Sequence, residues 1–254
     1  MNIAAPSLIP NLNECALLLD VDGTIVDLAP TPREVWIPPS LRNVLARLTE
    51  RTGGAVALVS GRPVNDLDLI FAPLVLTAVG GHGAEFRLVN DGHGVAPNPP
   101  PLDANLKRKL ATIGKIGPGI IVEDKGYALA LHYRLAPERE NVIRAEVAKI
   151  CAEHQSAAIE ILPGKLVVEI KPTGFTKATG VRTLMTYAPF AGRRPIFIGD
   201  DTTDECVFTI MPELNGLAIS VGRKVPGVTS YFDTPDSVRA WLERLALEEE
   251  KACP

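Results

Sequence analysis

The sequence lacks the features that mark membrane proteins, nucleic-acid binders and secreted proteins. Its apolar runs, such as Ala16–Leu19 and Ala55–Val59, are far shorter than the roughly 20 residues that cross a bilayer. Basic residues number 26 against 30 acidic ones, for a net charge of −4, and this balance excludes a general nucleic-acid binder or a polybasic membrane binder. Met1–Pro10 has neither a positive leading segment nor a clear cleavage site of small residues. We therefore expect no secretory signal and a cytoplasmic protein.

Cysteine is scarce as well. The four cysteines, Cys15, Cys151, Cys206 and Cys253, show neither CxxC nor zinc-finger spacing. Because disulfides are rare in the cytosol and buried thiols are common, we expect no disulfide and no cysteine-bound metal. The 254 residues, 46% of them hydrophobic and 22% charged, have the composition of a globular protein and suffice for one large domain or two small ones.

The N-terminal part alternates short buried strands with a helix. Apolar runs at Ala16–Asp20, Ala55–Ser60 and Leu74–Val79 end in an acid, a hydroxyl or glycine, as buried parallel strands do. Between the first two runs, apolar residues at helical spacing predict a helix capped by Ser40 that stops at Gly53. This order of elements predicts a parallel α/β sheet.

A proline-rich segment, Pro97–Pro101, separates this pattern from a different one. Beyond it we predict an αββαββ unit, an antiparallel sheet with helices on one face and a hairpin that turns at Pro163-Gly164. Its predicted elements are helices Leu102–Lys115 and Pro137–His154 and strands Ile120–Glu123, Tyr127–Tyr133, Ala157–Leu162 and Lys165–Ile170.

After Pro172 the first pattern returns. We predict helices at Thr176–Tyr187, Thr203–Met211 and Ser237–Glu249 and strands at Pro195–Gly199 and Leu217–Val221. The predicted fold is therefore an α/β, Rossmann-like parallel-sheet domain, residues 1–101 and 173–254, into which an α+β domain, residues 102–172, is inserted.

Alternation along the inserted strands predicts which side chains share a face. On the last strand Lys165, Val167 and Glu169 oppose Leu166, Val168 and Ile170, and His132 and Arg134 likewise oppose apolar neighbours. From Ala104 to Lys171 there are eleven Lys and Arg against eight Asp and Glu, so this segment carries +3 and the remainder −7. A basic unit beside an acidic one suits an anionic substrate held near a cation, although a polar sheet face can also simply be solvated.

Two acidic clusters follow buried strands. Asp20 and Asp22 leave the first strand, and Asp200, Asp201 and Asp204 follow the strand at Pro195–Gly199. The carboxyl ends of parallel strands form the edge where α/β sheets bind ligands, and adjacent carboxylates are costly unless a cation meets them. Neither cluster has His or Cys ligands or EF-hand spacing, so the pattern favours Mg²⁺ over zinc or calcium.

A further strand end and a helix start supply groups that can bind a phosphate. Ser60-Gly61-Arg62 closes the second strand, and Lys177 opens the helix after Pro172-Thr-Gly. A hydroxyl can hydrogen-bond a phosphoryl oxygen, and a lysine can neutralise charge shared by a nucleophilic carboxylate and a phosphate. The combination with a Mg²⁺ site indicates phosphate chemistry.

These motifs, in this order, resemble the four motifs of haloacid-dehalogenase-type phosphatases, and the inserted unit resembles the larger cap type of that superfamily. The matching segments are DVDGT at Asp20–Thr24, SGR at Ser60–Arg62, the helix-opening Lys177 and GDDTTDE at Gly199–Glu205. More narrowly, three segments are similar to trehalose-6-phosphate phosphatases, namely Gly81–Glu85, Glu123–Arg134 and Gly164–Gly174. The resemblance covers about residues 15 to 245. In one departure Ala178 follows Lys177 where we expect glycine, and we expect the extra methyl group to be tolerated.

The resemblance implies a role for each matching residue. Asp20 is then the nucleophile that accepts the phosphoryl group, and Asp22 is the general acid and then the base. Ser60 holds the phosphoryl group, Lys177 stabilises its charge, and Mg²⁺ is bound by Asp20, the Asp22 carbonyl and Asp200, with Asp201 and Asp204 orienting its waters. The residues expected to bind substrate are Thr24, Gly61, Arg62, His82, Glu123, Lys125, Arg134, Lys165 and Glu169. For His82 and His132 a purely structural role stays open.

The implied activity is Mg²⁺-dependent hydrolysis of trehalose 6-phosphate to trehalose and phosphate by a monomer, with closure of the cap at each turnover. Two enzyme alternatives share the same core, a phosphatase for another sugar phosphate such as sucrose phosphate and a hexose phosphomutase. A phospho-accepting signalling domain of the receiver type is an alternative of another class. The DxD pair and the large insertion count against it, because a switch needs a long-lived phosphoryl group and no lid.

Overall fold

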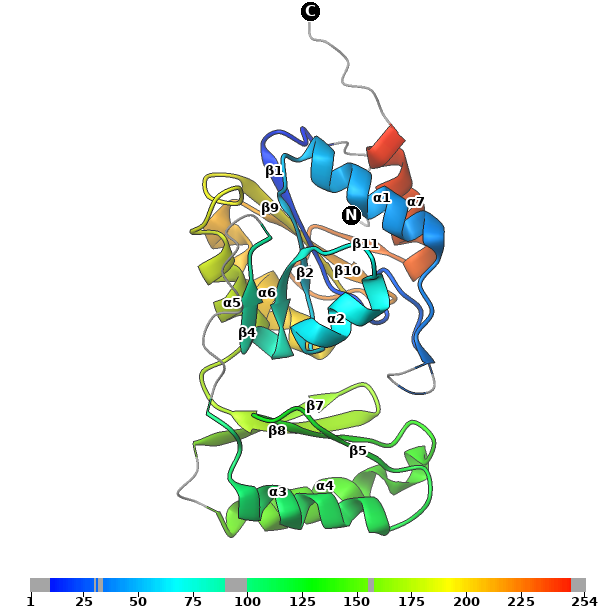
Figure 1. The fold of residues 1–254 in the computed structure, drawn as a ribbon, viewed down its shortest axis with the longest axis vertical. Helices are drawn as coiled ribbons and strands as arrows, with labels where there is room; N and C mark the ends of the chain where they lie inside the picture. Colours follow the sequence, from blue (N-terminus) through cyan, green and yellow to red (C-terminus); the bar gives the residue numbers. More distant parts are fainter. Residues whose placement is uncertain (1–9, 30, 32–33, 90–99, 155–157, 248–254) are drawn as a thin grey trace, which may run out of the picture.

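The computed structural model describes residues 10–29, 31, 34–89, 100–154 and 158–247. They form two sheets, each with its own helices (Figure 1). The larger sheet has seven strands in the order β11-β10-β9-β1-β2-β3-β4, and every neighbouring pair is parallel except β3 and β4. Its strands are β1 (Cys15–Leu19), β2 (Val56–Val59), β3 (Thr77–Gly80), β4 (Glu85–Arg87), β9 (Arg194–Gly199), β10 (Leu217–Val221) and β11 (Ser230–Phe232).

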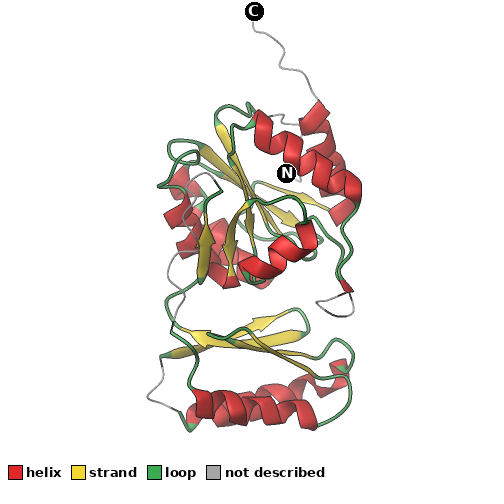
Figure 2. Cartoon of the chain, viewed as in Figure 1, coloured by secondary structure: helices red, strands yellow, loops and turns green. Residues whose placement is uncertain are grey.

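Helices cover both faces of the larger sheet (Figure 2). One face carries α1 (Pro39–Arg51), α2 (Val64–Phe71) and α7 (Pro235–Leu247), and the other carries α5 (Lys177–Leu184) and α6 (Glu205–Ile210). Because side chains alternate along a strand, Leu17 and Leu19 of the central strand β1 pack with the first group, and Ala16 and Leu18 pack with the second. β1 is therefore buried on both sides, and Asp20 follows it at the carboxyl ends of the parallel strands.

The smaller sheet has four antiparallel strands in the order β5-β6-β8-β7. They are β5 (Ile121–Asp124), β6 (Leu129–His132), β7 (Ile159–Gly164) and β8 (Val167–Pro172). Helices α3 (Ala104–Ala111) and α4 (Glu140–Ala152) pack on one face through an apolar cluster that includes Leu106, Leu110, Ile143, Val168 and Ile170. The other face lies toward the larger sheet (Figure 1), so both sheets contribute to the space between them.

The hairpin of the smaller sheet turns two residues later than predicted. β7 continues through Pro163, and Gly164 pairs with Val167, so Lys165 and Leu166 form the connection. Proline is tolerated in β7 because β7 is an edge strand, where a missing N–H removes no hydrogen bond to a further strand. Lys165 thus lies in the turn, whereas the predicted alternation placed it within the strand.

Other boundaries differ by a few residues. Helix α1 begins at Pro39, since proline is favoured in the first helical turn. Ser40 therefore lies inside the helix, and no side chain caps it. The predicted Ser40 cap is wrong. The predicted helices at 102–115 and 137–154 each contain a short 3₁₀ segment, η3 (Thr112–Lys115) and η4 (Pro137–Arg139). The helix predicted at 203–211 is preceded and begun by another, η5 (Thr202–Asp204), before α6. The strand predicted at 127–133 is shorter, and the one predicted at 74–79 begins three residues later. α2, β4 and β11 were not predicted; the two strands have three residues each.

A few predictions fall outside the described residues, namely residues 97–99, Ala157, Glu249, Cys253 and nearly all of Met1–Pro10. Within the described part, Cys15, Cys151 and Cys206 are free thiols. In the same part, no helix is both long and apolar enough to cross a bilayer.

Candidate active site

A cavity of about 160 Å³ lies between the strand ends of the larger sheet and the exposed face of the smaller one. The larger sheet and its helices contribute the loops after β1, β2, β3 and β9 and the start of α5, and the smaller sheet contributes β5, β6, β8 and the β7–β8 turn. The predicted site residues that line it are Asp20, Asp22, Ser60, Gly61, Arg62, His82, Glu123, Lys125, Arg134, Lys165, Glu169, Lys177, Asp200 and Asp201. Thr24 and Asp204 are fully buried behind this wall.

Asp20 is held from two sides. The Thr24 hydroxyl donates to its Oδ2 (2.9 Å), and Lys177 Nζ donates to its Oδ1 (2.8 Å). Lys177 also donates to Asp204 Oδ1 (2.7 Å). Although burial lowers the pKa of Lys177, the two carboxylates more than offset this and raise its pKa above the ordinary value. The ammonium group is thus kept charged beside Asp20.

The position of Lys177 follows from the start of helix α5. The Thr176 hydroxyl accepts from the Thr179 amide (3.1 Å), and the Thr179 hydroxyl accepts from the Thr176 amide (2.9 Å). This reciprocal capping starts the helix at Lys177. Ala178 is buried in the same turn, so the helix entry forms with alanine at this position.

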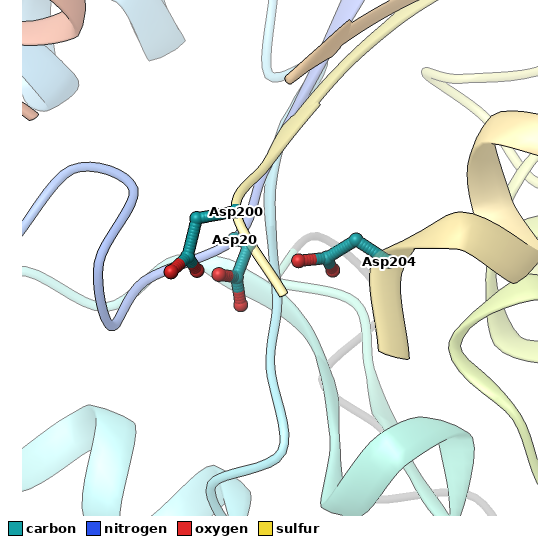
Figure 3. Close-up of side chains that lie close together, drawn as sticks. All are labelled: Asp20, Asp200 and Asp204. Carbon is teal, nitrogen blue, oxygen red and sulfur yellow. The ribbon is translucent and has the colours of Figure 1, made fainter. Parts of the chain in front are cut away.

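Three carboxylates lie close together, those of Asp20 and Asp200 directly after β1 and β9 and that of Asp204 on the short helical segment that follows (Figure 3). Asp20, Asp200 and Asp204 each offer an oxygen, and these oxygens lie within 4.8 Å of one another. Burial, with the neighbouring Asp20 and Asp204, raises the pKa of Asp200 to about 8. Burial and Asp20 also raise the pKa of Asp204 to about 7, against the effect of Lys177. A divalent cation would relieve this repulsion.

The three carboxylates are not equivalent. Both oxygens of Asp204 are engaged, one by Lys177 and the other by the Asp201 amide (3.0 Å). Asp200 has weaker contacts, 3.4 Å from the Thr24 hydroxyl and 3.9 Å from Lys165 Nζ. Gly23 leaves room for it, because a Cβ at Gly23 would lie 2.3 Å from Asp200 Oδ2. Asp20 and Asp200 also line the cavity, whereas Asp204 is fully buried behind it, so these two carboxylates can reach a cation in the cavity.

Asp22 faces a different partner. Arg62 donates two hydrogen bonds to its carboxylate, from Nε to Oδ2 (2.6 Å) and from Nη2 to Oδ1 (2.7 Å). The Arg62 amide also donates to Ser60 Oγ (3.1 Å). The residues after β1 and β2 are thus linked, because the two strands are neighbours in the sheet.

The smaller sheet brings its charged residues to the same cavity. Lys125 Nζ donates to Glu169 Oε2 (2.6 Å) and to the Gly61 carbonyl (2.9 Å). His82 Nε2 lies 3.5 Å from Glu169 Oε2, and its ring packs so closely on Gly61 that a Cβ there would lie 2.4 Å from Nε2. Burial raises the pKa of Glu169, but Lys125 and His82 more than offset it, so the pKa of Glu169 lies well below its usual range.

Two further contacts involve the same face. His132 Nε2 and Glu123 Oε2 are 2.7 Å apart, and Arg134 donates to the carbonyl of Ala29. Burial raises the pKa of Glu123, but the hydrogen bond from His132 and the nearby charge of Lys125 together outweigh it, so the net pKa of Glu123 is lowered. Burial also lowers the pKa of His82, with Glu169 acting in the opposite direction.

The later part of the loop after β1, beyond Thr24, is a part of the site that the sequence did not indicate. Leu28, Ala29, Thr31 and Val35 line the cavity beside the acidic residues. The loop carries no periodic or charged pattern that would single it out. It joins the site because Arg134 of the smaller sheet bonds to it.

Comparison with known proteins identifies the family. The family model described as trehalose-phosphatase matches residues 18–235 of the sequence. The chain belongs to the trehalose-phosphatase family. A probable trehalose-phosphate phosphatase of Sinorhizobium fredii is 38% identical over 239 residues, 93% of this chain and 89% of that protein. The trehalose-6-phosphate phosphatase of Escherichia coli is 34% identical over 238 residues, with the same two coverages of 93% and 89%.

Solved structures confirm the fold of this trehalose-phosphatase family member. The C-terminal domain of the C. albicans trehalose-6-phosphate phosphatase superposes with a TM-score of 0.81 and 21% identity, covering 94% of each chain. The predicted haloacid-dehalogenase-type fold, a parallel α/β core with a separate four-stranded antiparallel sheet, is confirmed.

Proposed function

We propose that the chain hydrolyses trehalose 6-phosphate to trehalose and inorganic phosphate, the last step of trehalose formation. The observation that supports this most strongly is the pairing of Asp20, held by Lys177 and Thr24, with a facing sheet of charged side chains. The first group suits phosphoryl transfer, and the second suits a disaccharide, whose hydroxyls donate and accept hydrogen bonds in many directions. The names of the most similar relatives agree with this substrate.

The proposed reaction has two displacements. An Asp20 carboxylate oxygen attacks phosphorus and forms an acyl phosphate while the bond from phosphorus to the sugar O6 breaks. Asp22 gives a proton to the departing oxygen. Water then attacks the phosphorus of the acyl phosphate, Asp22 takes a proton from that water, and phosphate leaves with Asp20 restored. Ser60 binds the phosphoryl group, and Lys177 stabilises its negative charge.

The residues at the strand ends fit a Mg²⁺ ion. Oxygen ligands suit this ion. Burial beside Asp20 and Asp204 raises the pKa of Asp200, so the lysines near the cluster do not fully offset its negative charge. Asp20, the Asp22 carbonyl and Asp200 would hold the ion, and Asp201 and Asp204 would orient its waters. When bound, Mg²⁺ offsets the repulsion between the carboxylates and the phosphate dianion.

The metal proposal predicts a stabilisation that depends on pH. The pKa of Asp200 is raised to about 8 in the fold, so without metal its contribution to stability is lost as pH rises from about 4 to 8. Mg²⁺ binds the ionised form, so it should raise Tm more at pH 8 than at pH 5, as measured by calorimetry. An equal shift of Tm at both pH values would contradict the metal site.

Exhaustive EDTA treatment should also abolish phosphatase activity, and Mg²⁺ should restore it.

The smaller sheet is proposed to be the cap that recognises the sugar through Glu123, Lys125, Arg134, Lys165 and Glu169. The proposed domain boundaries are 1–101 and 173–254 for the core and 102–172 for the cap. His82, which belongs to the core, lies 3.5 Å from Glu169. We further propose a monomeric, cytoplasmic enzyme.

Glu169→Gln tests the recognition role of the cap. Loss of the carboxylate leaves Lys125 without its ion-pair partner and removes an acceptor for sugar hydroxyls. We expect kcat/KM for trehalose 6-phosphate to fall about 100-fold, because unpaired buried polar groups discriminate strongly, with a much smaller change for p-nitrophenyl phosphate. Glu146→Gln, at a partly exposed helix position, is the matched control. Equal losses on both substrates would contradict the assignment.

A phosphate-release assay with Mg²⁺ tests the proposed substrate directly. We expect trehalose 6-phosphate to be hydrolysed with a far higher kcat/KM than sucrose 6-phosphate or glucose 6-phosphate. Preference for sucrose 6-phosphate would show that the cap recognises another disaccharide. Transfer of phosphate between hexose positions without net release would show a phosphomutase.

A further inference from the structure

We propose that Arg62 is a positioning residue that acts on the reaction through Asp22. This inference rests on the proposed function, in which Asp22 exchanges protons with the leaving sugar and with water. The resemblance to the family implied that Arg62 binds substrate. The geometry points to a different task, because its guanidinium group is engaged by Asp22.

Arg62 and Asp22 form a bidentate ion pair. Nε and Nη2 of Arg62 lie 2.6 and 2.7 Å from the two oxygens of Asp22. Such a fork holds both the direction and the plane of a carboxylate, which a single bond cannot do. The Arg62 side chain is 11% exposed and that of Asp22 is 30% exposed, so Asp22 reaches into the cavity while Arg62 supports it from the wall.

The two hydrogen bonds from Arg62 leave Asp22 free to transfer protons. Each carboxylate oxygen has about two lone pairs, and the fork uses one on each oxygen. In the first displacement one of the remaining positions carries the proton that passes to the leaving sugar oxygen, and in the second displacement a free lone pair accepts the proton of the attacking water. A carboxylate without the fork would rotate freely, and proton transfer requires a fixed donor–acceptor distance.

The backbone of Arg62 extends this control to the phosphate side of the site. Its amide donates to Ser60 Oγ (3.1 Å), and its carbonyl accepts from the Gly81 amide (2.8 Å). The loop after β2 is thereby tied to the loop after β3. One residue therefore sets the relative positions of the group proposed to bind the phosphoryl oxygen and the group proposed to move the proton.

Leaving-group dependence separates this role from substrate binding. Phenol is a poor leaving group and p-nitrophenolate a good one, so kcat/KM for phenyl phosphate depends on protonation by Asp22 far more than kcat/KM for p-nitrophenyl phosphate. The experiment measures both constants with Mg²⁺ for the parent, Arg62→Ala, Asp22→Asn and the double variant. Arg182→Ala, at an exposed position paired with Glu213, is the control for loss of an arginine, and circular dichroism and Tm check folding.

We expect Arg62→Ala to lower kcat/KM for phenyl phosphate about 100-fold, the lower range of general acid catalysis, and to lower that for p-nitrophenyl phosphate much less. In the Asp22→Asn background the same change should have less than about a threefold effect, since two residues that act as one unit are not additive. Arg62→Lys keeps the charge but not the fork, so its loss on phenyl phosphate should be intermediate. Should Arg62→Ala fail to fold, Arg62→Lys still tests whether Arg62 positions Asp22.

Two results would overturn the proposal. Equal losses on both substrates that persist in the Asp22→Asn background would show that Arg62 binds the phosphate itself. If instead Asp22→Asn alone keeps the parent's leaving-group dependence, the acid role of Asp22 is wrong, and the positioning role of Arg62 is overturned with it. The first result leaves the proposed function intact, whereas the second contradicts its mechanism.

Discussion

Asp20→Asn will abolish turnover while leaving the fold intact. An amide cannot replace the carboxylate oxygen that attacks phosphorus, so we expect kcat to fall by about 10⁴-fold or more, as when other covalent nucleophiles are removed. The side chain stays the same size, and its remaining oxygen can still accept from Lys177, which donates to Asp20 Oδ1 at 2.8 Å. The new amide nitrogen then lies beside the Thr24 hydroxyl, 2.9 Å from Asp20 Oδ2 in the parent, and this hydroxyl can turn to accept from it. The acidic cluster loses one negative charge, so Tm should not fall.

The measurements are phosphate release with trehalose 6-phosphate and thermal unfolding by circular dichroism. Asp27→Asn is the matched control, because Asp27 lies in the same loop but is exposed and pairs with Arg239. It should keep parental activity. Activity of Asp20→Asn within tenfold of the parent would remove Asp20 from the role of nucleophile.

Lys177→Met will cost both stability and activity. Lys177 is 3% exposed and its ammonium group contacts Asp20 and Asp204 at 2.8 and 2.7 Å. Removing one partner of a buried ionic group leaves the others uncompensated, which costs about 3–5 kcal/mol in the free energy of unfolding. In the native state, Asp204 would bind a proton more readily, because Lys177 lowers its pKa in the parent protein.

Urea unfolding and phosphate release check this prediction. Lys149→Met, at an exposed position on α4, should change neither quantity. Double replacement Lys177→Met/Asp204→Asn should recover part of the lost stability, because it removes one of the carboxylates left without a cation, while activity stays absent. A single Lys177→Met variant as stable as the parent would show that the ion pairs contribute nothing.

The strand ends were predictable from the sequence because their signal is local. An apolar run followed directly by acidic residues and glycine marks β1 with Asp20, and the same pattern marks β9 with Asp200. Parallel strands bring such ends to one edge. The larger domain and the αββαββ order of the insertion follow from the same local patterns.

Pairings between distant residues could not be predicted in the same way. Lys177 and Asp20 are 157 positions apart, and their contact depends on how α5 packs beside β1. The bidentate pair of Arg62 with Asp22 depends on side-chain rotamers as well. The sequence placed each residue at the correct edge of the sheet, but only the packed structure determines which neighbour each one contacts.

The misplaced hairpin turn has a specific cause. Pro163-Gly164 has turn composition, yet both residues belong to β7 because cross-strand pairing with β8 extends to Gly164. An edge position removes the usual objection to proline in a strand. Local composition was outweighed here by pairing along the whole hairpin.

The proposed mechanism requires Asp20 to carry the phosphoryl group between two displacements. Its most direct test is rapid acid quenching of Asp22→Asn with p-nitrophenyl phosphate and Mg²⁺, followed by peptide mass spectrometry. The good leaving group allows the first displacement, and loss of the base slows the second, so the peptide that contains Asp20 should carry one phosphoryl group that hydroxylamine removes. A phosphoryl group on Ser60 or on any other residue would contradict the account.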